Sequence, residues 1–349
     1  MGVRKALLTA LALAIVLAGC TEPASEPAPT TSADPAAIAA VEDTEAMAAH
    51  PVFELFWEEL EPLPAPVHGA ACTVHRGELW LLGGIGANGV TQSRVDHYSL
   101  LAQQWSRGIP LGEPRHHAAA YSDGDAVSIA GGYTDRNGAD MGATADVSQL
   151  AGIGFWVPGP ELPEPRAGAS VVLLDGRPVV VGGGPGEHLD VLAMDEPFGW
   201  NFVGQLHEPR VGAAALIHED GLVAVGGDAA GSVESIDLYV GKMDNSGASL
   251  SRREAMPTAR EGFAWATSGP LAYILGGQTT EGAITAASHM FNVQDGRWWH
   301  IPEAPAPFAD ACAVSVGDGV HVLGGLDVNG AASDRHWVLT WDRGENARR

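Results

Sequence analysis

Residues 115–132 of this 349-residue chain read RHHAAAYSDGDAVSIAGG. The small residues from Ala118 to Tyr121 predict one strand, and the apolar run from Ala126 to Ala130 predicts a second. Asp123-Gly124 between them is typical of a hairpin turn. The two glycines that close the stretch allow backbones to pass where a side chain would clash. The stretch therefore predicts an antiparallel hairpin with one crowded end.

The same pattern recurs six times, roughly every 50 residues. Glycine pairs close an apolar run at Gly83-Gly84, Gly131-Gly132, Gly182-Gly183, Gly226-Gly227, Gly276-Gly277 and Gly324-Gly325. Sixteen residues before each pair stands Val67, Arg115, Arg166, Arg210, Arg260 or Phe308. Ten residues before those positions stands Trp57, Trp105, Trp156, Trp200, Leu250 or Trp298. Such self-similarity indicates a series of equivalent structural units.

These repeats resemble kelch repeats, in which an apolar strand ending in Gly-Gly is followed by a Tyr-Asp strand and then a Trp. The stretches 98–105 and 291–298 keep the family's step from an aromatic residue to Trp. Repeats two and three depart from the Tyr-Asp part, and Leu250 replaces the Trp of repeat four. The resemblance covers about residues 52–345. It implies an all-β, six-bladed β-propeller of the kelch type over residues 51–349, with the Trp side chains between neighbouring blades.

Both ends of the repeat region are incomplete in a complementary way. The last repeat ends at Trp341-Asp342 without a fourth strand, whereas residues 53–60, which contain Trp57, form a fourth strand with no earlier three. We therefore expect an N-terminal outer strand to complete the last blade and close the ring.

The first fifty residues have the features of a targeting signal followed by a linker. Arg4 and Lys5 precede an apolar run that is too short to span a bilayer and that ends in Leu17-Ala18-Gly19-Cys20. This end resembles the bacterial lipobox. It implies a signal peptide over residues 1–19, a lipid on Cys20 and a location in the cell envelope, at the outer membrane or the periplasmic or extracellular face. A plain secretory signal is the alternative. The acidic Ala/Pro/Ser/Thr-rich segment 20–50 predicts a disordered tether.

Charge and cysteine content exclude some classes of protein. With 19 basic and 43 acidic residues the net charge is −24, so a nucleic-acid partner is not expected. Three cysteines are too few for a disulfide scaffold. Cys72 and Cys312 fall on innermost strands of neighbouring blades, one residue out of step. This offset favours buried free thiols, while an oxidising compartment leaves a disulfide as the alternative.

The strand order places the turn before each innermost strand and the loop after each glycine pair on one face, which we call the loop face. Loop length varies most there, and variable loops on a rigid scaffold commonly bind ligands. Four arginines occupy equivalent positions at the channel mouth of this face: Arg115, Arg166, Arg210 and Arg260. They are expected either to bind carboxylates of an acidic ligand or to brace the blades.

Other ionisable residues follow within two positions, namely His68, His116, His117, Glu261 and Asp310. Histidines with carboxylates bind metals or transfer protons. Their spacing is not that of a tight ligand set, so ordinary polarity of the rim is the main interpretation, and no cofactor or metal is predicted. Asp135-x-Asn137-Gly138-x-Asp140 resembles part of a calcium loop but lacks its closing Glu. A similar Asp-x-Asn-Gly at 327–330 favours turn chemistry instead.

The resemblance favours a lipid-anchored, exported, non-catalytic module that binds a protein, acidic peptide or glycan through the loop face, with the membrane contacted only by the N-terminal lipid. The alternative is an exported carbohydrate-processing enzyme resembling the kelch-type sialic acid mutarotases, which rests on fold analogy. An enzyme predicts ionisable groups that converge in a deep pocket at the channel mouth. A binding module predicts a shallow mouth with free arginine tips.

Overall fold

The computed structural model describes residues 54–342, apart from 153, 187, 196–198, 207–208, 219–220 and 228–255. The expected signal peptide, Cys20 and the tether of residues 20–50 lie outside the described residues. Within the described part every regular element is a β-strand, and no helix there has the length and apolar character to cross a membrane.

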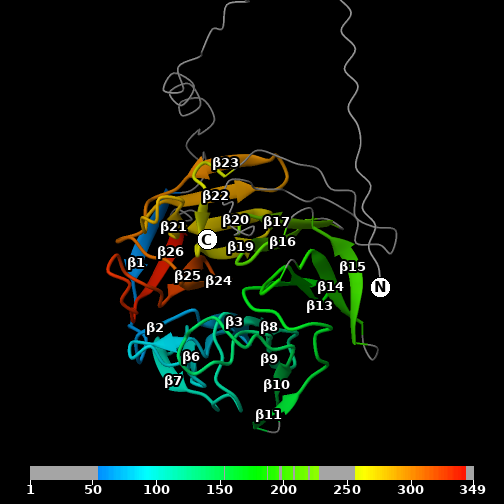
Figure 1. The fold of residues 1–349 in the computed structure, drawn as a ribbon. Helices are drawn as coiled ribbons and strands as arrows, with labels where there is room; N and C mark the ends of the chain where they lie inside the picture. Colours follow the sequence, from blue (N-terminus) through cyan, green and yellow to red (C-terminus); the bar gives the residue numbers. More distant parts are fainter. Residues whose placement is uncertain are drawn as a thin grey trace, which may run out of the picture. The chain divides into compact units, whose positions relative to one another are not determined.

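The chain forms the six-bladed β-propeller that the repeats predict (Figure 1). Blade one contains β3 (Ala71–His75), β4 (Glu78–Leu82), β6 (Val95–Ser99) and β7 (Gln104–Arg107). Blade two contains β8 (Ala119–Ser122), β9 (Val127–Ala130), β10 (Val147–Ala151) and β11 (Phe155–Pro158). Blade three contains β12 (Ser170–Leu174), β13 (Arg177–Val181), β14 (Asp190–Asp195) and β15 (Gly199–Gln205).

The other half of the ring follows the same order. Blade four is described through β16 (Ala214–His218) and β17 (Gly221–Val225) alone. Blade five contains β19 (Ala264–Ser268), β20 (Leu271–Leu275), β22 (Ser288–Asn292) and β23 (Arg297–His300). The innermost strands contact one another in the order β3, β8, β12, β16, β19, β24 and back to β3, so the ring is closed.

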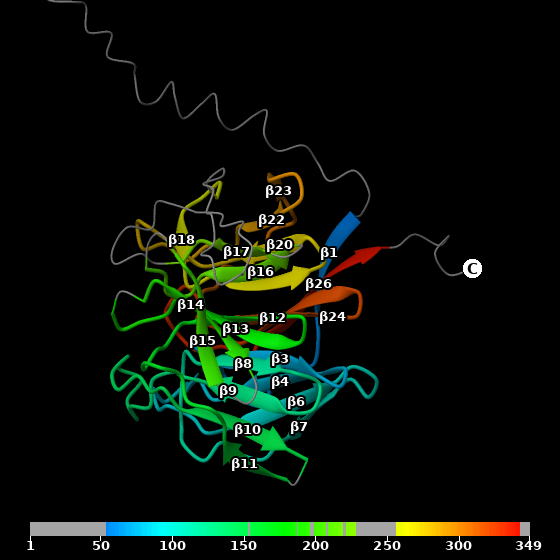
Figure 2. The same cartoon turned by 90° about the vertical axis from the view of Figure 1, so that its right-hand side faces the viewer.

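The N-terminal strand completes the last blade, as expected from the incomplete repeats. Blade six contains β24 (Cys312–Val316), β25 (Gly319–Leu323) and β26 (His336–Asp342), and β1 (Glu54–Glu59) pairs antiparallel with β26. Figure 2 shows β1 in blue beside β26 in red. The first and last described strands therefore belong to one sheet, which holds the ring together.

Two short ribbons confirm which loops share a face. In blade one, β2 (Val67–His68) pairs with β5 (Ile85–Gly86), and in blade five β18 (Arg260–Glu261) pairs with β21 (Gln278–Thr279). Each ribbon joins the turn before an innermost strand to the loop after the glycine pair. Those two segments therefore lie together on the loop face.

Among the described residues the core consists of six apolar clusters, one between each pair of neighbouring blades. The Trp side chains lie at these seams, as predicted. The indole nitrogen of Trp105 donates to the Glu61 carbonyl over 3.1 Å, and that of Trp156 donates to the Ile109 carbonyl over 2.9 Å. Each acceptor belongs to the segment that follows the outer strand of the preceding blade. The tryptophans therefore link blades on the outside of the ring.

The glycine pairs link blades on the inside. In five of the six pairs the second glycine donates its N–H to a carbonyl of the next blade, as Gly84 does to Arg115 over 2.9 Å and Gly132 does to Arg166 over 2.8 Å. A Cβ on the first glycine would lie 2.2 Å from the same carbonyl oxygen, both at Gly83 and at Gly131. Side chains are therefore excluded at this position by the neighbouring backbone.

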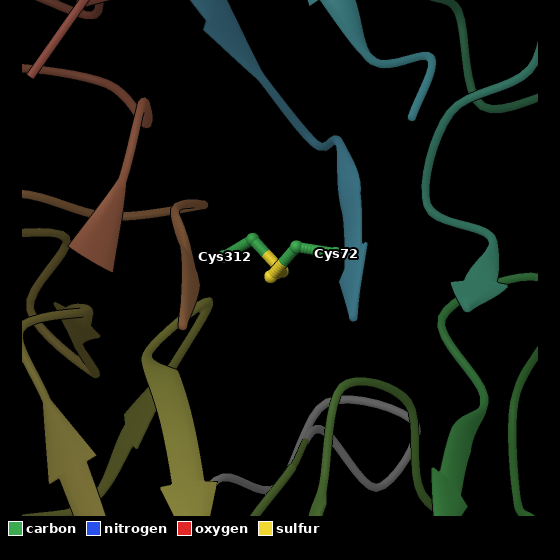
Figure 3. Close-up of a disulfide and its surroundings, with 2 residues drawn as sticks. All are labelled: Cys72 and Cys312. Carbon is green, nitrogen blue, oxygen red and sulfur yellow. A yellow bond between two sulfur atoms is a disulfide. The ribbon is translucent and has the colours of Figure 1, made fainter. Parts of the chain in front are cut away.

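The expectation of free thiols is wrong, because Cys72 and Cys312 form a disulfide between β3 and β24 (Figure 3). The rule that a one-residue offset points two side chains to opposite faces holds for strands that pair in one sheet. These strands belong to neighbouring sheets, which turn opposite faces toward each other. Cys72 and Cys312 accordingly point into the same cluster between blades six and one, whereas Ala71 points toward blade two. The offset is the one that a contact across this seam requires.

We expect Gly131→Ala to destabilise the propeller by more than about 2 kcal/mol, since an L residue must adopt a φ of 62° there and its Cβ meets the Arg166 carbonyl. Gly112→Ala is the control, because a Cβ there meets nothing within 4 Å. Chemical denaturation measures both free energies of unfolding. Equal stability of the two variants would contradict the close contact.

Reduction of the disulfide is expected to lower the free energy of unfolding by about 2–5 kcal/mol, because the bond closes a loop of 240 residues. Thermal unfolding of the chain with and without a reducing agent measures the effect. The double variant Cys72→Ser/Cys312→Ser serves as the control and should melt alike in both conditions. A parent chain that ignores the reducing agent would argue against the bond.

Candidate functional site at the channel mouth

Backbone hydrogen bonds join neighbouring blades around the channel on the loop face at five of the six blade boundaries. Each blade contributes one residue, two positions after the arginine or the residue that replaces it, with a φ between 49° and 68°. These residues, which we call the turn positions, are Gly69, His117, Gly168, Gly212, Gly262 and Asp310. His117 donates its N–H to the Gly69 carbonyl over 2.8 Å, and Gly168 donates to the His117 carbonyl over 2.7 Å. The turn positions therefore hold neighbouring blades in a fixed relation around the mouth.

Two of the six turn positions are not glycine. A left-handed backbone costs an L residue about 1–2 kcal/mol, so His117 and Asp310 sit where glycine would be favoured. Strain of this kind concentrates at functional sites. These two residues also contact each other through their side chains, which makes the mouth between blades six, one and two the candidate site.

Asp310 joins the histidines of two other blades. Its Oδ2 lies 2.6 Å from Nδ1 of His68, and its Oδ1 lies 2.9 Å from Nε2 of His117. Gly69 makes room for this contact, since a Cβ there would lie 3.0 Å from Nε2 of His117. One carboxylate from blade six therefore orients one imidazole from blade one and one from blade two.

The loop after the glycine pair of blade two adds two carboxylates. Asp135 accepts the backbone N–H of Ala139 over 2.7 Å and that of Met141 over 3.2 Å, which confirms turn chemistry for this loop. Oδ2 of Asp135 also lies 3.3 Å from Nε2 of His116. The loop places Oδ1 of Asp140 3.4 Å from Nδ1 of His117. The motif first compared with a calcium loop thus folds over the two histidines.

The electrostatics of the cluster follow from these contacts. Burial lowers the pKa of His117, but the charge of Asp310 and hydrogen bonds to Asp140 and Asp310 outweigh burial and raise this pKa to about 10. Burial raises the pKa of Asp310, but the charge of His117 and hydrogen bonds from both histidines hold it well below its usual range. The hydrogen bond to His117 is the main cause that lowers the pKa of Asp140. At neutral pH an imidazolium therefore lies between two carboxylates.

The cluster borders a cavity of about 990 Å³ along the channel. His68, His117 and Asp310 line it together with Tyr133, Asp140 and Glu261. Small residues of the inner strands, such as Ala118 and Ala119, line its deeper part. A cavity of this size fits a small polar ligand or a segment of a larger partner.

The structure gathers most of the predicted ionisable residues, and adds some. His68, His116, His117 and Asp310 come together, and Glu261 lines the same cavity. The sequence did not identify Asp135, Asp140 and Tyr133 as parts of this cluster. One signal for the site was the departure from glycine at two of six equivalent positions.

The expectation that the arginines present free guanidinium groups at the mouth is wrong. Arg115 is 3% exposed and Arg166, Arg210 and Arg260 are each 1% exposed. Each donates from Nη1 to the first glycine carbonyl of its own blade, over distances of 2.8–3.2 Å. The backbone carbonyls of Arg115, Arg166 and Arg210 accept the hydrogen bonds from the preceding blade. Of the two interpretations left open by the sequence, the one in which the arginines brace the blades describes them.

In blade six a different arginine binds the carbonyl of the first glycine. Phe308 replaces the arginine, and Arg335 from the loop face donates to the Gly324 carbonyl over 3.1 Å. Its guanidinium carbon lies 5.4 Å from the centre of the Phe308 ring and 4.7 Å from that of Trp337. In blade six, therefore, the carbonyl of the first glycine receives a guanidinium from another part of the chain.

Comparisons with known proteins agree with this architecture. The chain is 27% identical over 136 residues to Kelch-like protein 35 of Mus musculus, covering 38% of this chain and 21% of that protein. It is 31% identical over 131 residues to Kelch-like protein terF of Aspergillus terreus, covering 37% and 28%. Beta-scruin of Limulus polyphemus is 28% identical over 97 residues, covering 26% and 11%. The matches thus span less than a third of each relative.

A solved structure of YjhT superposes with a TM-score of 0.68 and 15% identity, covering 81% of this chain and 99% of that chain. At this identity the likeness shows the fold alone. No protein-family model matches the chain. The Kelch-like relatives and the blade arrangement together support a kelch-type propeller.

Arg115→Ala should destabilise the fold, because the carbonyls of Gly131 and Asp146 lose their guanidinium partner at a cost of about 1–3 kcal/mol for each that is left unpaired. Arg136→Ala, at an exposed position of the neighbouring loop, is the control. Urea denaturation compares the two. If Arg115→Ala were as stable as the parent chain, the bracing role of this arginine would be contradicted and ligand binding would be the remaining interpretation.

Proposed function

We propose that this chain is an exported, lipid-anchored, kelch-type propeller that binds a protein partner at the channel mouth of its loop face. Kelch-repeat propellers are in general protein-binding modules. The observation that carries the proposal is the cluster of His68, His117 and Asp310 beside the cavity of about 990 Å³. Three blades contribute to it at the turns that hold the ring together.

Export and anchoring rest on separate observations. Residues 17–20, Leu-Ala-Gly-Cys, end the apolar run and make Cys20 the candidate for lipidation. The disulfide between Cys72 and Cys312 supports an oxidising compartment, because such bonds persist mainly in exported proteins. Lipid attachment would then keep the propeller at a membrane surface of the cell envelope.

The chemistry of the mouth favours a polar or basic segment of the partner. Asp140, Asp310 and Glu261 line the cavity, while the arginines that were expected to receive an acidic ligand are buried. The net charge of −24 also repels acidic partners. The oxygens of the carboxylates accept hydrogen bonds from hydroxyl, amide or ammonium groups.

A second function is favoured by the contacts of Asp310. A carboxylate that orients two imidazoles at the edge of a cavity is an arrangement suited to proton transfer. It supports the alternative of a carbohydrate-processing enzyme resembling the sialic acid mutarotases. Equilibration of sialic acid anomers, followed by NMR with and without the chain, tests this alternative: acceleration that Asp310→Asn abolishes would favour the enzyme.

Binding of the detergent-purified full chain to peptide and glycan arrays tests the main proposal. We expect peptide ligands, and we expect Asp310→Asn to weaken their binding at least tenfold, since it removes the charge that orients His68 and His117. Asp125→Asn, exposed in the hairpin between β8 and β9, is the matched control. Equal binding by all three proteins would remove the channel mouth from recognition.

A further inference from the structure

Three ligand atoms of blade two converge on one point. Nδ1 of His116 lies 2.8 Å from Nδ1 of His117, and Oδ1 of Asp140 lies 3.6 Å and 3.4 Å from those two nitrogens. In a tetrahedral site with bonds of about 2.0–2.2 Å to imidazole and carboxylate, ligand atoms lie roughly 3.3 Å apart. The three distances bracket this value, so a single ion can reach all three atoms at normal bond lengths.

The outer nitrogens of both imidazoles are engaged by carboxylates. Nε2 of His117 lies 2.9 Å from Asp310, and Nε2 of His116 lies 3.3 Å from Asp135. Because a carboxylate accepts a hydrogen bond, each Nε2 carries the hydrogen, and in the neutral rings both Nδ1 lone pairs point into the cluster. Carboxylates behind the ligand histidines are a regular feature of zinc sites, where they fix the tautomer and the ring orientation.

Two imidazole nitrogens and one carboxylate oxygen thus lie close enough together to share one ion. A divalent ion of the zinc class suits two imidazoles and one carboxylate, whereas Mg²⁺ and Ca²⁺ prefer oxygen ligands.

The surroundings combine a rigid base with an open side. The His116 side chain is fully buried, and its ring lies 5.3 Å from that of Tyr133, centre to centre. The Asp140 side chain is 61% exposed, which leaves a path for an ion from the channel mouth. His117 and Asp140 both adopt a positive φ, of 49° and 52°. The backbone is thus held in a costly conformation at two of the three ligands.

We propose that His116, His117 and Asp140 form a binding site for a zinc-class divalent ion, oriented by Asp135 and Asp310. Three protein ligands leave a fourth position toward the cavity, where water or an oxygen of a bound molecule can coordinate. This site goes beyond the proposed partner binding and stands without it, because its ligands come from blade two alone.

Titration of the EDTA-treated and dialysed full chain with Zn²⁺, by calorimetry and by competition with a chromophoric chelator, tests the site. We expect one saturable equivalent per chain, insensitive to excess Mg²⁺, together with a higher melting temperature in Zn²⁺. Asp140→Asn and His117→Gln should each weaken binding at least tenfold, and the orienting variant Asp310→Asn should weaken it about 10- to 100-fold.

Asp327→Asn is the matched control for Asp140→Asn. Asp327 belongs to the equivalent loop of blade six, where it accepts the backbone N–H of Asn329 and of Ala331 but does not contribute to the blade-two cluster. Melting curves in EDTA show whether each variant folds. Should His117→Gln not fold, the exposed Asp140 decides the outcome. No saturable Zn²⁺ binding, or equal affinity in Asp140→Asn and Asp327→Asn, would overturn the proposal.

Discussion

The contact between a glycine pair and the backbone of the next blade sets the geometry of this propeller. In five of the six blades the second glycine donates to a carbonyl of the neighbouring blade, and the first lies so close to that oxygen that no side chain fits. Where the neighbour has an arginine, as at Arg115 and Arg166, its guanidinium binds the first glycine carbonyl of its own blade and so connects one junction to the next. Repeated around the ring, this junction fixes how near the inner strands come to the axis. The apolar clusters and the Trp hydrogen bonds then fill and close the space farther out.

The candidate site is a modification of the second set of contacts between blades, which the turn positions make. The turn positions need a left-handed backbone, and blades one, three, four and five supply glycine. Blades two and six supply His117 and Asp310 instead, and these side chains meet across blade one, over the space that Gly69 leaves. The ring thus brings together three blades that are consecutive in space although Asp310 is far from His68 in the sequence. Their spacing is set by backbone hydrogen bonds rather than by mobile side chains.

The same region contains the seam at which the ring closes. Blade six takes its outer strand from the N-terminal side, the disulfide joins its innermost strand to that of blade one, and Asp310 reaches His68 across the same boundary. Covalent, backbone and side-chain links therefore coincide at one seam. A site built there is held rigidly, which favours a small set of ligand geometries.

Much of the fold could be predicted from the sequence, because the repeat spacing, the Asp-Gly hairpins and the unpaired terminal strands are local patterns. The fate of the arginines could not be read in this way. An arginine at a channel mouth can bind either a ligand or a backbone carbonyl. Which of the two it binds depends on how deeply its side chain is buried, and the repeat pattern does not specify this depth. The disulfide was missed because the facing residues of neighbouring blades follow an opposite alternation. The approach of Asp140 to His117 depends on how the blade-two loop folds around Asp135, which its Asp-x-Asn-Gly motif alone does not specify.

Amide hydrogen exchange shows whether the inner junctions, rather than the individual sheets, hold the ring. If the junctions hold it, the N–H groups of Gly84, Gly132 and His117 exchange only through global unfolding, as slowly as those of the central strands, although they lie in turns. Exchange of these amides at the rate of exposed loops, while the strand amides stay protected, would instead mean that the blades are held by their apolar faces alone.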